Sequence, residues 1–242
     1  LGPPATAATA TQVSTGGAYP RDAHYKLMND LDLSSVDNWD PIGSDSAHYF
    51  RGIFDGQGFI LHNLQVDRQS ENDIGLFSNV MDSGVIKNLN IGVENVYGLG
   101  NVGALVGGES AGNIINCHIE IPSSSDIIAY GSGTLGGMVG ENHHGTILNC
   151  SVNVEGSIKA EGNDPADDIG GIAGLNSGVI KWCWTEGGGS INGSDSKQAG
   201  GIAGNSSETI SQCYSSCKYV DGYNQAGGIV GNVLSGKVSK CY

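Results

Sequence analysis

The chain has 242 residues, a formal net charge of −14, and 40 glycines against only six prolines. It lacks the basic face that a nucleic-acid-binding protein needs, and its charge disfavours binding to an anionic membrane surface. The glycines follow no three-residue period, which excludes collagen, and no apolar run reaches the roughly 18 residues of a membrane span. The composition therefore predicts an acidic protein that is extracellular or lies at the cell surface.

The first 49 residues are expected to form an N-terminal flank and a cap. Residues 1–24 are rich in Ala, Thr and Gly, whereas HYKLMNDLDLS at 24–34 alternates apolar and polar residues as a strand does. WDPIG at 39–43 is predicted to be a turn, and residues 24–49 are expected to cap the open end of the fold that follows. Because the sequence lacks an initiator Met and stops within a repeat, we expect it to be part of a longer chain.

Residues 50–66, FRGIFDGQGFILHNLQV, are predicted to form a first, shorter repeat unit. In this alignment Gly52 matches Gly75 of IGLFSNV, and Leu64 matches Leu89.

A glycine-flanked apolar hexapeptide then recurs as VGALVG, LGGMVG, IGGIAG, AGGIAG and AGGIVG. Its second residue is in turn Gly103, Gly136, Gly170, Gly200 and Gly227. The steps between these glycines are 33, 34, 30 and 27 residues, and a cysteine follows each glycine after 13 or 14 residues. These cysteines are Cys117, Cys150, Cys183, Cys213 and Cys241. Two markers that keep register across loops of varying length indicate a repeat architecture.

The segments between the markers, such as INCHIEI and LNCSVNV, alternate with a period of two, and no segment shows a 3.6-residue period with helix caps. The sequence therefore predicts an all-β fold over residues 50–242, a single-stranded parallel β-helix (β-solenoid) with about 30 residues per coil and right-handed coiling. One inward apolar column is expected from Leu105, Met138, Ile172, Ile202 and Ile229. The flanking glycines are expected to permit tight turns and positive φ.

The cysteines are expected to form a second column, because stacked coils lie about 4.8 Å apart. The column aligns with Leu89, which favours buried thiols that act as small apolar residues. A strained disulfide between coils and a zinc site remain alternatives, although zinc needs four ligands around one point rather than in a line. Asn88, Asn116 and Asn149 precede column positions and are expected to form a ladder at a corner. Cys217 lies outside the column.

The residues directly after the column cysteines are expected to point outward: His118, Ser151, Trp184, Tyr214 and Tyr242. One interpretation is a surface ladder that stabilises neighbouring coils. The other is an aromatic platform for sugar rings, with Trp182 nearby. The candidate binding residues are therefore His118, Trp182, Trp184 and Tyr214.

The clustered carboxylates fall in two predicted loops, EGNDPADD at 161–168 and NDLDLSSVDNWD at 29–40. In the first, Asp164, Asp167 and Asp168 are candidate Ca²⁺ ligands, and the alternative is a solvated loop that keeps the surface soluble. The sequence has no H-E-x-x-H, G-x-S-x-G or P-loop motif, so we assign no catalytic residue and no cofactor.

Taken together, HYKLMNDLDLS, WDPIG, FRGIFDGQGFILHNLQV, IGLFSNV and the repeated GGIAG or GGIVG segments resemble the GLUG-motif proteins over residues 24–242. In that family the repeats occur in large bacterial secreted or surface proteins, including adhesin-like chains and the N-terminal regions of IgA1-protease-like metallopeptidases. The resemblance implies a surface-exposed repeat module in which the repeats themselves are not catalytic.

The expected function is that of a non-catalytic module, adhesive or structural, whose partner is a host or matrix protein or a glycan. One alternative is an accessory domain of a larger secreted protease. Another is a carbohydrate-active β-helix enzyme, which would require Asp or Glu side chains clustered with Arg or Lys on an exposed strand face.

Overall fold

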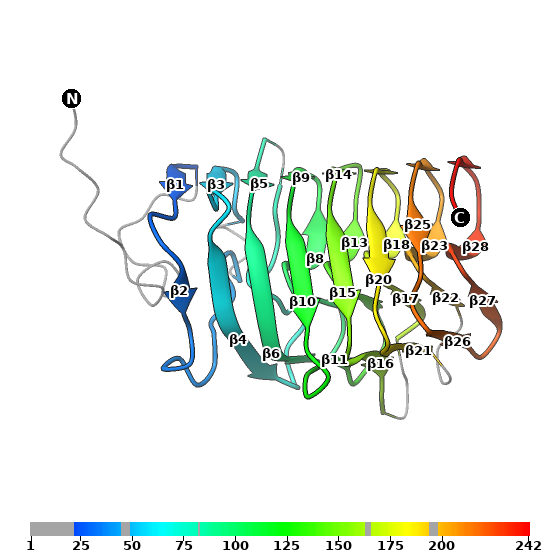
Figure 1. The fold of residues 1–242 in the computed structure, drawn as a ribbon, viewed down its shortest axis with the longest axis horizontal. Helices are drawn as coiled ribbons and strands as arrows, with labels where there is room; N and C mark the ends of the chain where they lie inside the picture. The colour runs from blue at the N-terminus through cyan, green and yellow to red at the C-terminus, as the bar shows by residue number, and fades with distance from the viewer. Residues whose placement is uncertain (1–21, 45–48, 82, 163–165, 194–197) are drawn as a thin grey trace.

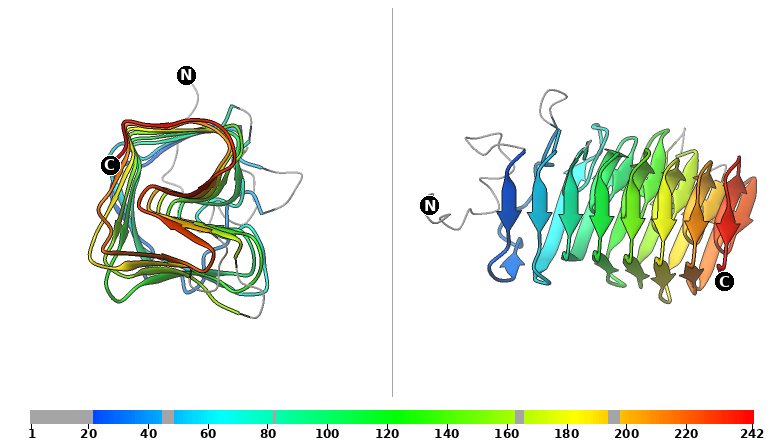
Figure 2. Two further views of the ribbon diagram at one scale, coloured as in Figure 1. Left: turned by 90° about the vertical axis from the view of Figure 1, so that its right-hand side faces the viewer. Right: turned by 90° about the horizontal axis from the view of Figure 1, so that it is seen from above.

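The computed structural model describes residues 22–44, 49–81, 83–162, 166–193 and 198–242, and this part of the chain contains strands and turns but no helix (Figure 1). The strands wind around one long axis in about seven coils of roughly 30 residues, which confirms the predicted parallel β-solenoid. The chain runs down the face nearest the viewer in Figure 1, crosses below and returns behind, and Figure 2 shows the same path from the end. This path is a right-handed coil, as expected for crossovers between parallel strands.

The largest sheet has eleven strands and forms two sides of each coil. The long strands β4 and β6 run along both sides, whereas each later coil has a separate short strand on each side. Its first side consists of β2 (Leu31–Asp32), β4 (Ile60–Arg68), β6 (Asn90–Gly98), β10 (His118–Ile121), β15 (Ser151–Val154), β20 (Trp184–Glu186) and β25 (Tyr214–Ser215). Its second side consists of the later half of β4 and β6 together with β11 (Asp126–Ala129), β16 (Ser157–Ala160), β21 (Ser190–Gly193) and β26 (Tyr219–Gly222).

An eight-stranded parallel sheet forms the top of the coils in Figure 1. It consists of β1 (His24–Lys26), β3 (Ile53–Asp55), β5 (Val85–Lys87), β9 (Asn113–Ile115), β14 (Thr146–Leu148), β19 (Val179–Lys181), β24 (Ile210–Ser211) and β29 (Val238–Ser239).

Two five-stranded sheets form a pair of arms that enter the middle of the cross-section and leave it again (Figure 2). The entering arm consists of β7 (Val102–Gly103), β12 (Thr134–Gly136), β17 (Asp168–Gly170), β22 (Gln198–Gly200) and β27 (Gln225–Gly227). The leaving arm consists of β8 (Val106–Ser110), β13 (Val139–Asn142), β18 (Ala173–Asn176), β23 (Ala203–Ser206) and β28 (Val230–Val233).

The hexapeptide glycines lie where these two arms pack backbone against backbone. A Cβ atom on Gly170 would lie 2.0 Å from the Ala173 carbonyl oxygen, and one on Gly140 would lie 2.0 Å from the Gly107 carbonyl oxygen. The expectation of positive φ was wrong for the described glycines of the hexapeptides, because none of them has it. Except at Gly228 in the last coil, where a Cβ atom would meet nothing within 4 Å, these positions need glycine for close approach of main chains rather than for a left-handed turn.

The inward apolar column is confirmed at the tip of the arms. Leu105, Met138, Ile172 and Ile202 are fully buried, whereas Ile229 is only partly buried because it lies in the last coil. The arms thus place an apolar side chain at the centre of the core in each coil that contains them.

The cysteine column is also in the core. Cys117, Cys150, Cys183 and Cys213 are free and buried, while Cys241 and Cys217 are partly exposed. Each column thiol donates to the main-chain carbonyl two residues earlier, as the Cys150 Sγ does to Leu148 O at 3.2 Å. Burial raises the pKa of the Cys150 thiol, so it stays protonated and behaves as an apolar residue.

The predicted corner ladder is confirmed. Asn88, Asn116 and Asn149 all have positive φ, between 51° and 53°. The Asn149 side-chain amide donates to Asn116 Oδ1 at 2.8 Å, and that of Asn116 donates to Asn88 Oδ1 at 3.2 Å. The Asn88 amide in turn donates to Asp55 Oδ1 at 3.0 Å, so a buried carboxylate begins the ladder.

Asp55→Asn is expected to remove part of the acid sensitivity of the fold. Burial alone would raise the pKa of Asp55, but hydrogen bonds from Asn88 and Gln57 hold it at about 2. Because the folded-state pKa is depressed, this stabilisation is present above the unfolded-state pKa of about 3.9 and is lost as the pH falls through about 2. The measurement is urea unfolding at a series of pH values. Between pH 5 and pH 2 the free energy of unfolding should fall by about 2 kcal/mol less in the variant than in the wild type.

The control is Asp37→Asn, which changes an exposed carboxylate. A wild-type pH dependence in Asp55→Asn would show that the carboxylate does not act as described.

Residues 22–44 are stacked on the next coil in parallel register, through β1 with β3, β2 with β4, and a bridge between Ile42 and Phe77. The described part of the predicted cap is therefore itself a coil, and HYKLMNDLDLS forms two short strands on two sides of it. Residues 1–21 lie outside the described residues. The expected match of Gly52 with Gly75 was wrong, because Ile53 pairs with Val85. The match of Leu64 with Leu89 was also wrong, because a bulge pairs Leu64 with Val93.

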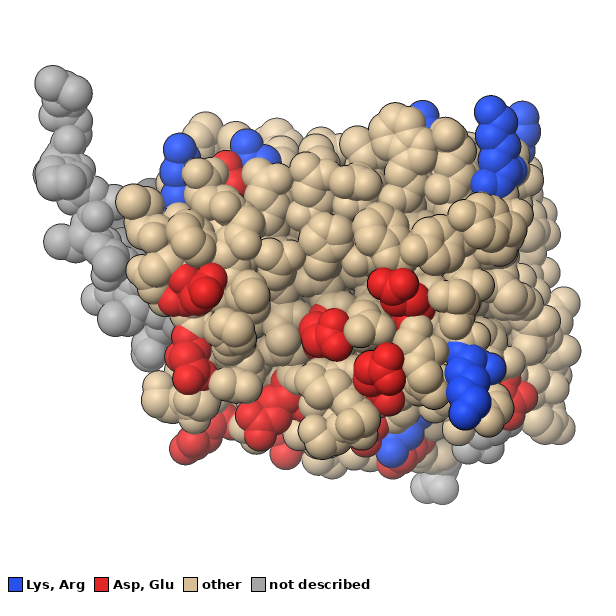
Figure 3. All heavy atoms as spheres, viewed as in Figure 1, with Lys and Arg blue, Asp and Glu red and all other residues tan. Residues whose placement is uncertain are grey.

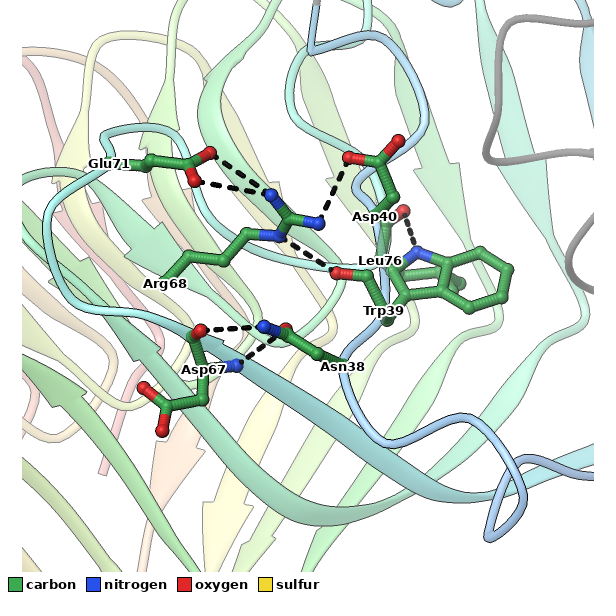
Figure 4. A network of polar contacts seen from close by, with 7 residues as sticks. All are labelled: Asn38, Trp39, Asp40, Asp67, Arg68, Glu71 and Leu76. Atoms are coloured by element: carbon green, nitrogen blue, oxygen red, sulfur yellow. Dashed lines mark hydrogen bonds and ion pairs between the residues drawn. The ribbon is translucent and has the colours of Figure 1, made fainter.

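Figure 4 shows how this first coil is fastened. The Trp39 indole is buried and donates from Nε1 to Leu76 O at 3.0 Å. Arg68 donates to Trp39 O at 3.1 Å and forms ion pairs with Asp40 and Glu71 at 3.3 and 3.2 Å. WDPIG is thus a buried anchor as well as a bend, because its tryptophan fills the core and its polar atoms are paired.

Candidate ligand-binding face

The first side of the large sheet exposes two parallel rows of side chains, which we call the strand face. Inward residues such as Ile119 and Val152 alternate with outward ones, so each strand contributes to both rows. The upper row is Ile60, Asn90, His118, Ser151, Trp184 and Tyr214, in register across six coils. The lower row, two residues further along each strand, is Asp32, His62, Gly92, Glu120, Asn153 and Glu186.

Aromatic side chains occupy the C-terminal half of the upper row. The Trp184 and Tyr214 rings are nearly parallel, 12° apart with centroids at 6.1 Å, and Tyr242 continues the row at 5.5 Å from Tyr214. His118 contacts Trp184 across the small side chain of Ser151, with ring centroids 5.7 Å apart. The predicted outward row is thus a ladder of contacts between coils in which Ser151 is itself buried, and its role in binding stays a prediction.

Polar side chains of the strand face hold one another in place. His118 Nδ1 lies 2.7 Å from Ser151 Oγ, and burial lowers the pKa of His118, which favours the neutral imidazole. Both Glu120 carboxylate oxygens accept from the Asn153 side-chain amide, at 2.9 and 3.0 Å. The Trp184 indole Nε1 donates to Glu186 Oε1 at 3.4 Å. These contacts orient the groups of both rows in the absence of any ligand.

The acidic members of the lower row were missed by the sequence analysis, which located the clustered carboxylates in loops. Glu120 and Glu186 lie on exposed strands instead, with Asn153 between them. A signal was present, because each of these three residues follows a column cysteine by three positions.

A hollow of roughly 430 Å³ lies in the strand face around Gly92, between the side chains of His62, His118 and Glu120. Asn90, Ser151, Asn153 and Glu186 complete its polar lining, and no Lys or Arg is among the described residues that form it. Figure 3 views this face directly: acidic side chains gather over its lower half, and a band above them carries no charged side chains. The strand face is therefore a shallow, partly aromatic surface with a negative lower edge.

Trp182 does not belong to the strand face. It occupies the corner position of the Asn ladder, with φ of 56° and 46% of its surface exposed. The Lys181 ammonium lies 4.2 Å from the centre of its ring. Of the four predicted binding residues, the structure thus brings together His118, Trp184 and Tyr214 and separates Trp182 from them.

The predicted Ca²⁺ ligands are only partly described. Asp164 lies outside the described residues, Asp168 is buried at the start of β17, and Asp167 is partly exposed beside it. Across the described ranges no group of three or more His, Cys, Asp or Glu side chains is arranged to hold a metal ion. Ca²⁺ binding therefore stays a prediction, based on the sequence alone.

The fold and the strand face define the chain as a parallel β-solenoid repeat module. No family model matches it. Halomucin of Haloquadratum walsbyi is 36% identical over 119 residues, which cover 46% of this chain and 1% of halomucin. A protein of Evansella cellulosilytica provisionally named a Gly-rich membrane protein is 35% identical over 108 residues, which cover 40% of this chain and 12% of that protein.

The fold is similar to the crystal structure of a Bacteroides ovatus protein provisionally named an immunoglobulin A1 protease, with a TM-score of 0.67 and 23% identity. The similarity covers 90% of this chain and 68% of that one, and at this identity it shows a shared fold alone. The chain matches only a small fraction of the length of halomucin and of the Evansella cellulosilytica protein. In its described part, no helix is long and apolar enough to cross a membrane.

Proposed function

We propose that this chain is a non-catalytic module of a secreted or cell-surface protein, and that it presents the strand face to a glycan or a protein of a host or matrix. The observation that carries the proposal is the combination of an aromatic row and a polar row on one rigid sheet. Binding loses less conformational entropy when the contact groups are already ordered, and the contacts within and between the two rows provide that order.

The stacked coils suit presentation of a surface. Each coil contacts mainly its neighbours, so adding coils extends the same rigid face. The two relatives support a role within a longer chain, since the module matches 1% and 12% of their lengths. One relative is named as a membrane protein, which agrees with a place at the cell surface.

The arrangement of the strand-face carboxylates favours binding over catalysis. Glycoside hydrolysis needs one carboxylic acid with a raised pKa to protonate the leaving group. Here both Glu120 oxygens already accept hydrogen bonds from the Asn153 amide, and among the described residues no basic side chain lines the hollow. Glu120 and Glu186 are therefore assigned to ligand contact.

Trp184→Ala is expected to weaken ligand binding at least about tenfold without unfolding the protein, because it removes the largest ring of the strand face. The probes are an array of neutral, amino and acidic oligosaccharides together with purified mucin and fibronectin. Binding of the immobilised chain to each probe is measured by surface plasmon resonance, and the recovered probes are analysed by mass spectrometry.

The matched control is Tyr223→Ala, which removes an aromatic ring that is 77% exposed and lies off the strand face. We expect this control to bind like the wild type and all probes to be recovered unchanged. The proposal fails if a probe is cleaved by the wild type, if no probe binds, or if both variants bind as tightly as the wild type.

A further inference from the structure

We propose that the hollow around Gly92 is a binding subsite for a non-acidic hexose chain that lies along the solenoid axis, with amino sugars favoured over neutral ones. This inference rests on the proposed function, because it specifies the ligand of the strand face. It is carried by the shape of the hollow, the charge of its lining and the repeat of the groups along the axis.

The shape of the hollow follows from a missing side chain. Gly92 lies in the lower row between His62 and Glu120, and all three residues line the hollow. A Cβ atom on Gly92 would meet nothing closer than Leu61 O at 3.9 Å and His62 Cα at 4.0 Å, so the space above this strand is open. A volume of roughly 430 Å³ lies within the range of small-ligand sites and accommodates a sugar ring.

The lining selects against acidic ligands. It presents the Glu120 and Glu186 carboxylates and the amides of Asn90 and Asn153, and its described residues include no Lys or Arg to balance a ligand carboxylate, sulfate or phosphate. The chain as a whole carries a net charge of −14, which repels polyanions over a longer range. Sugar hydroxyls can donate to these acceptors, and an ammonium group forms stronger, charge-assisted hydrogen bonds with the carboxylates.

Several of these acceptors are already oriented. The Asn153 amide holds Glu120, the Trp184 indole holds Glu186, and Ser151 holds the His118 ring through Nδ1. Within the described part of the chain His118 Nε2 has no hydrogen-bond partner, so this atom is available to a ligand hydroxyl. A ligand therefore does not have to order these side chains when it binds.

A linear chain fits the repeat of the strand face. Equivalent groups recur at the coil spacing of about 4.8 Å, which is comparable to the length of one hexose unit in an extended chain. From the hollow, the upper row continues along the axis through Trp184, Tyr214 and Tyr242, whose rings offer apolar surface to sugar rings. An extended peptide is disfavoured, because β6, β10 and β15 are each paired on both sides and offer no free backbone for strand addition.

The test is to fill the hollow. Gly92→Tyr directs a ring into the hollow from a position where the Cβ atom itself is not crowded, and Gly92→Ala adds only a methyl group there. Gly228→Tyr is the matched control, because a Cβ atom there also meets nothing within 4 Å but lies off the strand face. Circular dichroism and thermal unfolding establish that each variant folds.

The probes are three hexamers, of glucosamine, of glucose in β-1,4 linkage and of galacturonate, titrated by isothermal calorimetry at one ionic strength. We expect the glucosamine hexamer to bind most tightly, the glucose hexamer more weakly and the galacturonate hexamer not at all. Gly92→Tyr should weaken binding at least tenfold, Gly92→Ala should weaken it less because a methyl group fills less of the hollow, and Gly228→Tyr should bind like the wild type. Glu120→Gln should remove most of the preference for glucosamine.

Three results would overturn the inference: no binding of either non-acidic hexamer, equal or tighter binding of galacturonate, or unchanged binding by Gly92→Tyr. If Trp184→Ala loses binding to a probe that Gly92→Tyr retains, the strand face binds ligands but the hollow is not the subsite. If neither variant changes the binding of any probe, the proposed function fails as well.

Discussion

Replacing Gly170 by alanine is expected to destabilise the fold by about 3 kcal/mol or more, although only one methyl group is added. The new Cβ atom would lie 2.0 Å from Ala173 O, 2.7 Å from Ala203 Cα and 2.9 Å from Ala173 C. All three atoms belong to main chain that is fixed by sheet hydrogen bonds, so no side chain can move aside. The two arms would have to separate, and the coils on both sides would lose contacts with them.

Urea unfolding followed by circular dichroism measures this effect. Gly92→Ala is the control, because it makes the same chemical change within a strand where the nearest atom is 3.9 Å away. We expect the control to be nearly as stable as the wild type or slightly more stable. Equal unfolding midpoints for Gly170→Ala and Gly92→Ala would show that the arms are not packed backbone to backbone.

Ile172→Asp is expected to cost several kcal/mol and to prevent stable folding of the middle coils. Ile172 has no exposed surface and lies in the tip column between Met138 and Ile202. A carboxylate there would be buried among apolar side chains without a partner, so it would either remain charged at a high desolvation cost or be protonated.

The control is Thr146→Asp, which introduces the same group on β14 at a partly exposed position flanked by the register partners Asn113 and Val179. Thermal unfolding followed by circular dichroism compares the two. A Thr146→Asp variant that loses as much stability as Ile172→Asp would contradict the assignment of inward and outward positions.

The features predicted from the sequence are those that repeat at a constant short spacing. The inward tip column, the cysteine column and the Asn corner each recur at a distance from a repeated glycine that varies by at most one residue, so their alignment needed no knowledge of the loops between them. Short-range alternation also placed His118, Trp184 and Tyr214 on one outward row. Trp182 lies at the corner rather than in this row, because it comes two residues before Trp184, where the strand begins.

Features that depend on contacts between distant segments were not predicted. The bulge between Leu61 and Leu64 shifts the register of the second coil, so counting residues misaligned that coil with the later ones. The lower row was overlooked because Glu120, Asn153 and Glu186 are 33 residues apart and share no residue type that marks a row. The hollow depends on Gly92, and a single glycine gave no signal in a sequence that contains so many others.

The sequence by itself thus determined the class of fold, the coil length and the inward and outward assignment of most marker residues, because these follow from periodicity along one chain. The tertiary structure decided why the hexapeptide glycines are needed and which side chains meet on the strand face. The physical reason is that a glycine can serve either a turn or a close approach, and only the position of the facing main chain distinguishes the two. Neighbours on adjacent coils are likewise set by register across loops of different length, which local patterns do not encode.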